Sequence, residues 1–149
     1  MQTPIFFLSL ALSALVNADS DQVSPQVKIE AEYRQYVSDF VARDFEAIAS
    51  HFSPPIQRTS FEGSFVLQTK DEIVSMYQTM MANIQAGYSY SEIDSIDVQA
   101  MSPSTYAADV DFTRYNANNQ VIFAGRSIYL FGKHSGDWKM FSMIQAERE

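Results

Sequence analysis

The sequence contains no cysteine among its 149 residues, which excludes disulfide bonds and thiolate metal ligands. It has no Asn-x-Ser/Thr acceptor for N-glycosylation, and its five glycines do not cluster into a phosphate-binding loop. Hydrophobic residues make up 46% of the chain, which is enough for an ordinary core in one domain of this length. Such a domain must be held together by packing alone.

Basic residues are also scarce. Ten Lys and Arg stand against eighteen Asp and Glu, giving a net charge of −8, and the segment Asp71–Thr113 has no basic residue at all. An acidic chain without a basic cluster repels phosphate backbones, so we expect no nucleic-acid partner. The acidic segment is either a docking surface or, as we favour, a solvated face with a charged edge strand.

No long hydrophobic run is available to span a bilayer. The apolar and small-residue run Ile5–Val16 reaches only ~18 Å as a helix, whereas a span needs ~20 residues. It ends in Val16-Asn17-Ala18, a small-residue cleavage pattern, although no Lys or Arg precedes it. We therefore predict a signal peptide over residues 1–18 and a mature domain over 19–149. That domain is expected to be exported, to a bacterial periplasm or the medium, without membrane attachment.

Three helices are predicted in the first part of the mature chain. Ser24-Pro25 pairs a capping hydroxyl with a first-turn proline, and Asp44 is expected to cap a second short helix that Pro54-Pro55 ends. Thr69 opens a capping box with Glu72, and the third helix is expected to stop at Gly87. The runs 56–60 and 64–68 read as a short hairpin between the second and third helices.

From residue 88 onward the pattern is that of β-strands. The strand-like runs are Tyr106–Tyr115, Gln120–Leu130 and Trp138–Glu147, and the last two are apolar on both faces. A sheet that is apolar on both faces needs helices on one side and a second partner on the other. The sequence therefore predicts an α+β domain that forms a homodimer.

Several local signatures accompany this order of elements, namely Tyr36–Phe52 with Arg43-Asp44, Pro54-Pro55, Lys70-Asp71-Glu72-Ile73, Arg114-Tyr115-Asn116-Ala117, Tyr129 and Gly136-Asp137-Trp138-Lys139-Met140. With them, residues 25–147 resemble the nuclear-transport-factor-two-like superfamily, which has the SnoaL-like cone fold. The resemblance implies a cone-shaped, strongly bent and mostly antiparallel sheet wrapped around the N-terminal helices and a third helix. It also implies a cavity against the concave face and dimerisation through the other face. Members include isomerases, dehydratases, epoxide hydrolases, cyclases and non-catalytic domains, so the fold leaves the function open.

The turn at Asn116–Asn119 decides how two of the long strands pair. A four-residue loop sets Asp109 opposite Arg126, whereas a two-residue loop sets Asp111 there. Both registers leave the same side chains on the same face. The face of these strands that is richer in aromatic residues matches the Tyr and Met stripes of the helices, and we assign it to the cavity.

The same reasoning at the turn 134–137 places Ser142 near Tyr129 on the cavity face, unless a β-bulge inverts the local alternation. We expect the cavity to bind a small apolar or amphipathic molecule. The predicted binding residues are Tyr33, Tyr36, Met76, Met80, Tyr106, Arg114, Ser127, Tyr129 and Ser142. His51 and His134 lack any zinc-ligand spacing, so we expect neither a metal ion nor a cofactor.

An enzymatic alternative uses the opposite face of the sheet. Asp109, Asp111 and Arg126 resemble the paired carboxylates and arginine of limonene-epoxide hydrolases, although the close Arg-x-Asp arrangement of those enzymes is missing. A cross-strand ion pair on a dimer face is the interpretation that we favour. Three functions remain open at this stage: a small-molecule-binding domain, an isomerase, dehydratase or epoxide-hydrolase type of enzyme, and a non-catalytic assembly domain.

Overall fold

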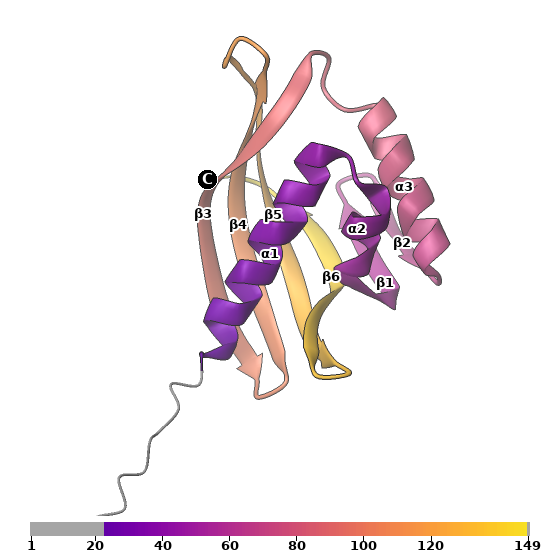
Figure 1. Ribbon diagram of the computed structural model, residues 1–149, viewed down its shortest axis with the longest axis vertical. Helices are drawn as coiled ribbons and strands as arrows, with labels where there is room; N and C mark the ends of the chain where they lie inside the picture. The colour runs from indigo at the N-terminus through magenta and orange to yellow at the C-terminus, as the bar shows by residue number, and fades with distance from the viewer. Residues whose placement is uncertain (1–22, 149) are drawn as a thin grey trace, which may run out of the picture.

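A computed structural model describes residues 23–148, which form three helices packed on one side of a six-stranded sheet (Figure 1). The helices are α1 (Pro25–Ala42), α2 (Phe45–Ser50) and α3 (Lys70–Ala82). The strands are β1 (Phe52–Ser60), β2 (Gly63–Leu67), β3 (Tyr88–Ser102), β4 (Thr105–Asn116), β5 (Val121–His134) and β6 (Asp137–Ala146). The predicted signal peptide, residues 1–18, lies outside the described residues. None of the helices in the described part is long and apolar enough to cross a membrane.

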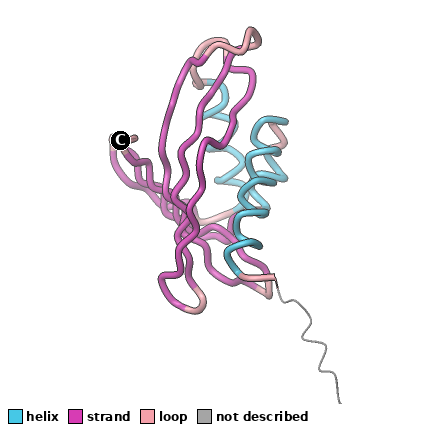
Figure 2. Tube along the Cα trace, turned by 90° about the vertical axis from the view of Figure 1, so that its left-hand side faces the viewer, coloured by secondary structure: helices cyan, strands magenta, loops and turns pink. Residues whose placement is uncertain are grey.

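The strand order is β2-β1-β6-β5-β4-β3, and every pair is antiparallel except β1 with β6. Helix α1 lies across the long strands, while α2 and α3 lie over the end formed by β1 and β2 (Figure 1). Figure 2 shows the sheet curling around the helices, so that one face is concave and covered. The predicted α+β cone with a strongly bent, mostly antiparallel sheet is therefore confirmed.

The helices begin where the sequence predicts. Side-chain oxygens of Ser24, Asp44 and Thr69 each accept a hydrogen bond from the amide three residues later, at 3.4, 3.0 and 3.2 Å. Each bond satisfies a backbone N–H that has no partner within its helix. The Glu72 carboxylate also accepts from the Gln68 amide, which ties the chain before α3 back to its first turn.

The ends of the second and third helices differ from prediction. Helix α3 ends at Ala82 rather than at Gly87, because the side-chain amide of Asn83 donates to the Thr79 carbonyl at 2.8 Å and closes the last turn. Helix α2 ends at Ser50, and Pro54-Pro55 lies inside β1. A proline has no N–H for the ladder, and the pairing of β1 with β6 is interrupted across this segment.

The four-residue-loop register between β4 and β5 is wrong. Asp111, not Asp109, is opposite Arg126. The turn contributes one residue, because Tyr115 pairs with Val121 rather than Gln120, and Ile122 is a second extra residue between this pair and the pair Arg114–Phe123. The shift amounts to two residues along the ladder. Side chains alternate with a period of two, so the predicted assignment of β4 and β5 side chains to the two faces survives.

A β-bulge in β6 moves the side chains that follow it to the opposite face of the sheet. Phe131 pairs with Met140, but the next pair is Leu130 with Ser142, so Phe141 is the extra residue. Met143 therefore stands opposite Tyr129, and the predicted placement of Ser142 there is wrong. From this bulge onward, β6 presents to the concave side the residues that strict alternation assigned to the outer side.

The core fills the space between the helices and the concave face. Its large, fully buried side chains come from α1, α2, α3 and the strands, and they are Ile29, Tyr33, Ile48, Ile56, Ile73, Tyr77, Val110, Phe131 and Met140. Aromatic rings join the layers, since Tyr36 of α1 contacts Tyr77 of α3 and Tyr129 of β5 at ring-centroid distances of 6.1 and 5.8 Å. This aromatic layer forms the deep wall of the candidate site.

Candidate ligand-binding cavity

A cavity of about 1010 Å³ lies between the helices and the concave face, and it opens to solvent. Helices α1 and α3, the segment that follows α3 and five of the six strands contribute to its lining. Its aromatic lining residues are Tyr33, Tyr36, Phe40, Phe61, Tyr77, Phe112, Phe123 and Tyr129. A concave site with aromatic walls and a few polar groups is typical of proteins that bind small organic molecules.

Three tyrosine hydroxyls at the deep wall are neutral. Burial raises the pKa of Tyr33, Tyr36 and Tyr77 well above the ordinary value. The Tyr77 hydroxyl donates to the sulfur of Met143 at 3.2 Å, so the Tyr36 hydroxyl must be the donor in its 2.8 Å bond to Tyr77. The Tyr36 and Tyr77 hydroxyl protons are therefore already engaged, and a neutral tyrosine hydroxyl is a poor general base.

Arg114 of β4 is the most unusual polar residue of the cavity. Its guanidinium carbon lies 5.2–6.0 Å from the ring centroids of Phe40, Tyr88, Phe112 and Phe123. Its terminal nitrogen donates to the side-chain oxygen of Gln85 at 2.7 Å, and its Nε is buried without a hydrogen-bond partner. Burial lowers the pKa of Arg114, but the guanidinium remains charged at physiological pH.

The structure brings together six of the nine predicted binding residues, which are Tyr33, Tyr36, Met80, Arg114, Ser127 and Tyr129. The other three lie elsewhere: Met76 packs against the core, Tyr106 contacts Trp138 edge-on at 5.0 Å, and Ser142 follows the β6 bulge. Their binding role stays a prediction. Sequence reasoning missed Arg58, Gln85 and Met143, because a turn and a bulge bring them to the cavity.

The predicted catalytic alternative has a different geometry. Arg126 donates to both carboxylate oxygens of Asp109, at 2.8 and 2.6 Å, and this hydrogen bond holds the pKa of Asp109 below its ordinary value. Asp111 accepts a bond from Ser95 at 3.3 Å, and its other oxygen is buried without a partner. Arg126 lines the cavity, but both aspartates alternate with buried Val110 and lie on the outer face. Their catalytic role stays a prediction.

Substituting Gly125, which lies under the aromatic rings around Arg114, tests how tightly this region is packed. An added methyl would sit 2.6 Å from Phe123 and 2.7 Å from Phe112, so Gly125→Ala is expected to lower the free energy of unfolding by about 1–3 kcal/mol. Urea denaturation measures the change. Gly132→Ala on the same strand is the control, because its methyl would meet Phe141 at an ordinary 3.4 Å. Equal effects of the two substitutions would contradict the expected close packing.

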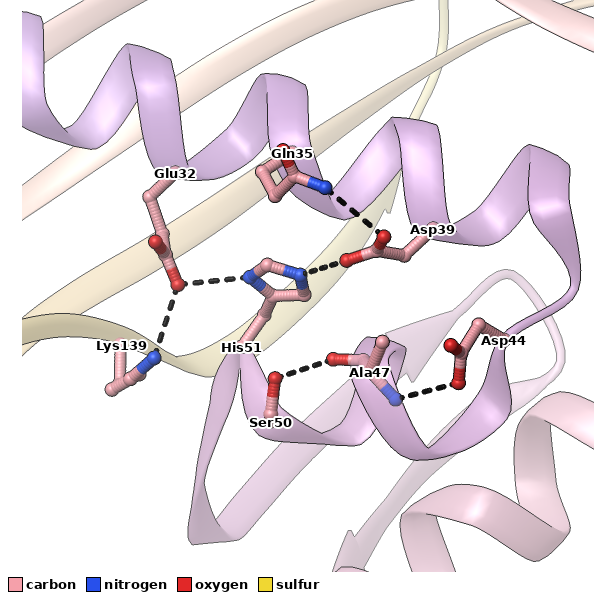
Figure 3. Close-up of polar contacts among 8 residues, drawn as sticks. All are labelled: Glu32, Gln35, Asp39, Asp44, Ala47, Ser50, His51 and Lys139. Carbon is pink, nitrogen blue, oxygen red and sulfur yellow. Dashed lines mark hydrogen bonds and ion pairs between the residues drawn. The ribbon is translucent and has the colours of Figure 1, made fainter.

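A second polar cluster lies outside the cavity, where α1 meets the start of β1 (Figure 3). The ring of His51 is held by Glu32 through Nδ1 at 2.8 Å and by Asp39 through Nε2 at 2.7 Å. Carboxylates only accept hydrogen bonds, so both ring nitrogens donate and the ring is an imidazolium. Lys139 donates to the same Glu32 oxygen that His51 bonds, and Gln35 donates to the other oxygen of Asp39, at 3.1 Å each.

The charged groups of this cluster shift one another's pKa values. Burial lowers the pKa of His51, but the hydrogen bonds and charges of Glu32 and Asp39 outweigh burial and raise it above the ordinary value of 6.5. The bond from His51, assisted by Lys139, lowers the pKa of Glu32 against the opposing effect of burial. The cluster therefore joins α1 to β1 and β6 through a charged ring.

The sequence matches a family model. Residues 25–148 match the model of the family described as NTF2-like protein (DUF6841). No curated protein matches the chain.

Solved structures share the fold at low identity. A domain of unknown function with a cystatin-like fold from Nostoc punctiforme is 18% identical with a TM-score of 0.66, over 81% of this chain and 75% of that one. An NTF-2-like protein of unknown function from Shewanella oneidensis is 12% identical with a TM-score of 0.66, over 83% and 100%. Another from Pseudomonas putida is 12% identical with a TM-score of 0.67, over 83% and 86%. At these identities the similarity concerns the fold alone.

Proposed function

This chain belongs to the NTF2-like family DUF6841, and we propose that it binds a small apolar or amphipathic molecule between its helices and the concave face of its sheet. The observation that carries the proposal is the cavity of about 1010 Å³ with its aromatic walls. Burying an apolar ligand against such walls is favourable by roughly 25 cal/mol for each Å² removed from water. The Tyr36 hydroxyl is bonded to Tyr77 and the Tyr77 hydroxyl to Met143, so at these two residues the ring surfaces are what remains for the ligand.

The proposed setting is export as a homodimer. The apolar run Ile5–Val16 with its cleavage pattern supports export. The outer face of the sheet supports dimerisation. In the single chain it carries apolar side chains that are only half-buried, namely Ile128, Leu130, Phe141 and Ile144. A second copy placed on this face would cover that apolar surface.

Native mass spectrometry of the purified mature chain tests ligand binding and dimerisation together. The expected result is a dimer that carries a co-purified small molecule. An empty dimer would contradict ligand binding and favour an assembly role, and a monomer would contradict the use of the outer face. Turnover of the identified molecule by the purified protein would favour the enzymatic alternative.

A cavity-filling variant locates the bound molecule. Ser127 lines the cavity, so Ser127→Trp is expected to abolish the adduct by occupying its place. Gln99→Trp adds the same side chain at an exposed position on β3 and is expected to retain the adduct. Retention by both variants would place the molecule outside the cavity and overturn the proposal.

A further inference from the structure

Basic residues outnumber acidic residues in the lining of the cavity, whereas acidic residues outnumber basic residues in the whole chain. The chain has ten basic residues and eighteen acidic residues, with a net charge of −8. The charged residues that line the cavity are four arginines and two glutamates, namely Arg58, Arg114, Arg126, Arg148, Glu62 and Glu147. Arginine side chains gathered at one cavity of an acidic protein are places where an anion can bind, if the protein does not already pair them.

Two of these arginines are neutralised by the protein itself. Arg126 pairs with Asp109 at 2.6 Å, and Arg148 pairs with Asp94 at 2.9 Å. Within residues 23–148, Arg114 and Arg58 have no carboxylate within ion-pair distance, and Arg58 instead lies over the ring of Phe65 at 5.7 Å. Arg114 therefore carries a positive charge inside the cavity that no carboxylate of the described residues pairs directly.

Arg114 is the better placed of the two to meet a ligand inside the cavity. Four aromatic rings surround its guanidinium, and these rings attract the cation without accepting strong hydrogen bonds. A guanidinium has five N–H donors, but the only acceptor bonded to Arg114 in the described chain is the neutral amide oxygen of Gln85. A buried cation with so few acceptors is costly unless an anion completes its hydrogen bonds.

We propose that the cavity selects ligands with a single anionic group, a carboxylate on an apolar body, and that Arg114 binds the carboxylate. This inference rests on the ligand-binding function proposed above. A carboxylate offers two oxygens to the guanidinium, and the apolar body of the ligand lies against Phe40, Tyr36 and Tyr129. A dianion such as a phosphate monoester is disfavoured, because one arginine leaves its second charge unbalanced among aromatic rings.

Matched pairs of acids and neutral analogues test the inference. Isothermal titration calorimetry at pH 7.5 compares 2-naphthoate with 2-naphthamide, and decanoate with 1-decanol. The wild-type protein is expected to bind each acid at least about tenfold more tightly than its neutral partner, as a charge-assisted hydrogen bond provides. Arg114→Gln is expected to remove this preference while leaving the affinity for the neutral probes within about threefold.

Two further variants keep the test decisive. Arg34→Gln makes the same change of charge on the exposed side of α1, outside the cavity, and is expected to keep the preference for acids. Arg114→Lys keeps the charge and is expected to retain part of the preference. If Arg114→Gln does not fold, the wild-type ratio and the Arg114→Lys ratio decide the question.

The outcomes separate this inference from the function on which it rests. Equal binding of acids and neutral analogues by the wild type, or equal weakening of all four probes in Arg114→Gln, would overturn anion selection and leave cavity binding standing. Binding of none of the four probes by the folded wild-type protein would overturn both proposals.

Discussion

Replacing Tyr77 by alanine is expected to lower the free energy of unfolding by about 4 kcal/mol, because it empties a large, fully buried site. The ring of Tyr77 lies at the junction of the helices with the sheet. It contacts Tyr36, Phe40 and Phe52 at ring-centroid distances of 6.1, 6.1 and 5.9 Å. No single neighbouring side chain is able to fill the space, since these rings already pack against one another. Urea denaturation followed by circular dichroism measures the loss.

The conservative variant separates the ring of Tyr77 from its hydroxyl. Tyr77→Phe keeps the ring but removes the acceptor of the Tyr36 hydroxyl and the donor to Met143, so a cost of about 1 kcal/mol is expected. A loss below about 2 kcal/mol for Tyr77→Ala would show that the site collapses around the smaller side chain. Equal losses for the two variants would show that the hydroxyl, rather than the packing of the ring, carries the effect.

Replacing His51 by alanine is expected to lower the free energy of unfolding by about 3 kcal/mol near pH 6. The substitution removes a buried imidazolium and leaves the carboxylates of Glu32 and Asp39 facing each other without their shared partner. These carboxylates are partly exposed, at 26% and 18%, and Lys139 remains beside Glu32, so the loss falls at the lower end for a broken buried ion pair. His134→Ala, at the exposed end of β5, is the matched control and is expected to change stability by less than about 0.5 kcal/mol.

The effect of His51 depends on pH in a defined direction. The pKa of His51 is raised in the folded protein, so its stabilisation is complete below the unfolded value of 6.5 and is lost as the pH rises through the folded value. The pKa of Glu32 is lowered, so its share is present above 4.5 and is lost as the pH falls through its folded value. The difference between wild type and His51→Ala should be largest between pH 4.5 and 6.5 and smaller at pH 9. An equal difference at pH 6 and pH 9 would mean that the ring acts by packing alone.

The two clusters have different consequences for the proposed function. The tyrosine cluster forms the wall that a ligand would touch, so changes there are expected to alter both stability and binding. The His51 cluster lies behind that wall, with its ring 6.0 Å from Tyr36, and joins α1 to the sheet. A substitution at His51 should therefore lower stability without changing the preference between acids and neutral analogues.

Features that depend on neighbouring residues could be predicted from the sequence. The three helix starts were predictable because a capping side chain bonds the amide only three residues away. The faces of β4 and β5 were predictable because alternation depends on parity, and the error in register was an even number of residues. These features, with the order of the elements, were enough to identify the fold.

Features that join distant parts of the chain could be seen only in the folded structure. The bulge at Phe141 exchanged Ser142 for Met143 at the cavity, and local alternation carries no signal for such an extra residue. The rings around Arg114 come from α1, β3, β4 and β5, and the carboxylates that charge His51 lie 12 and 19 residues before it. Patterns of hydrophobicity and capping predict contacts between residues that are close in sequence. The partner of a buried charge depends instead on how the whole domain packs.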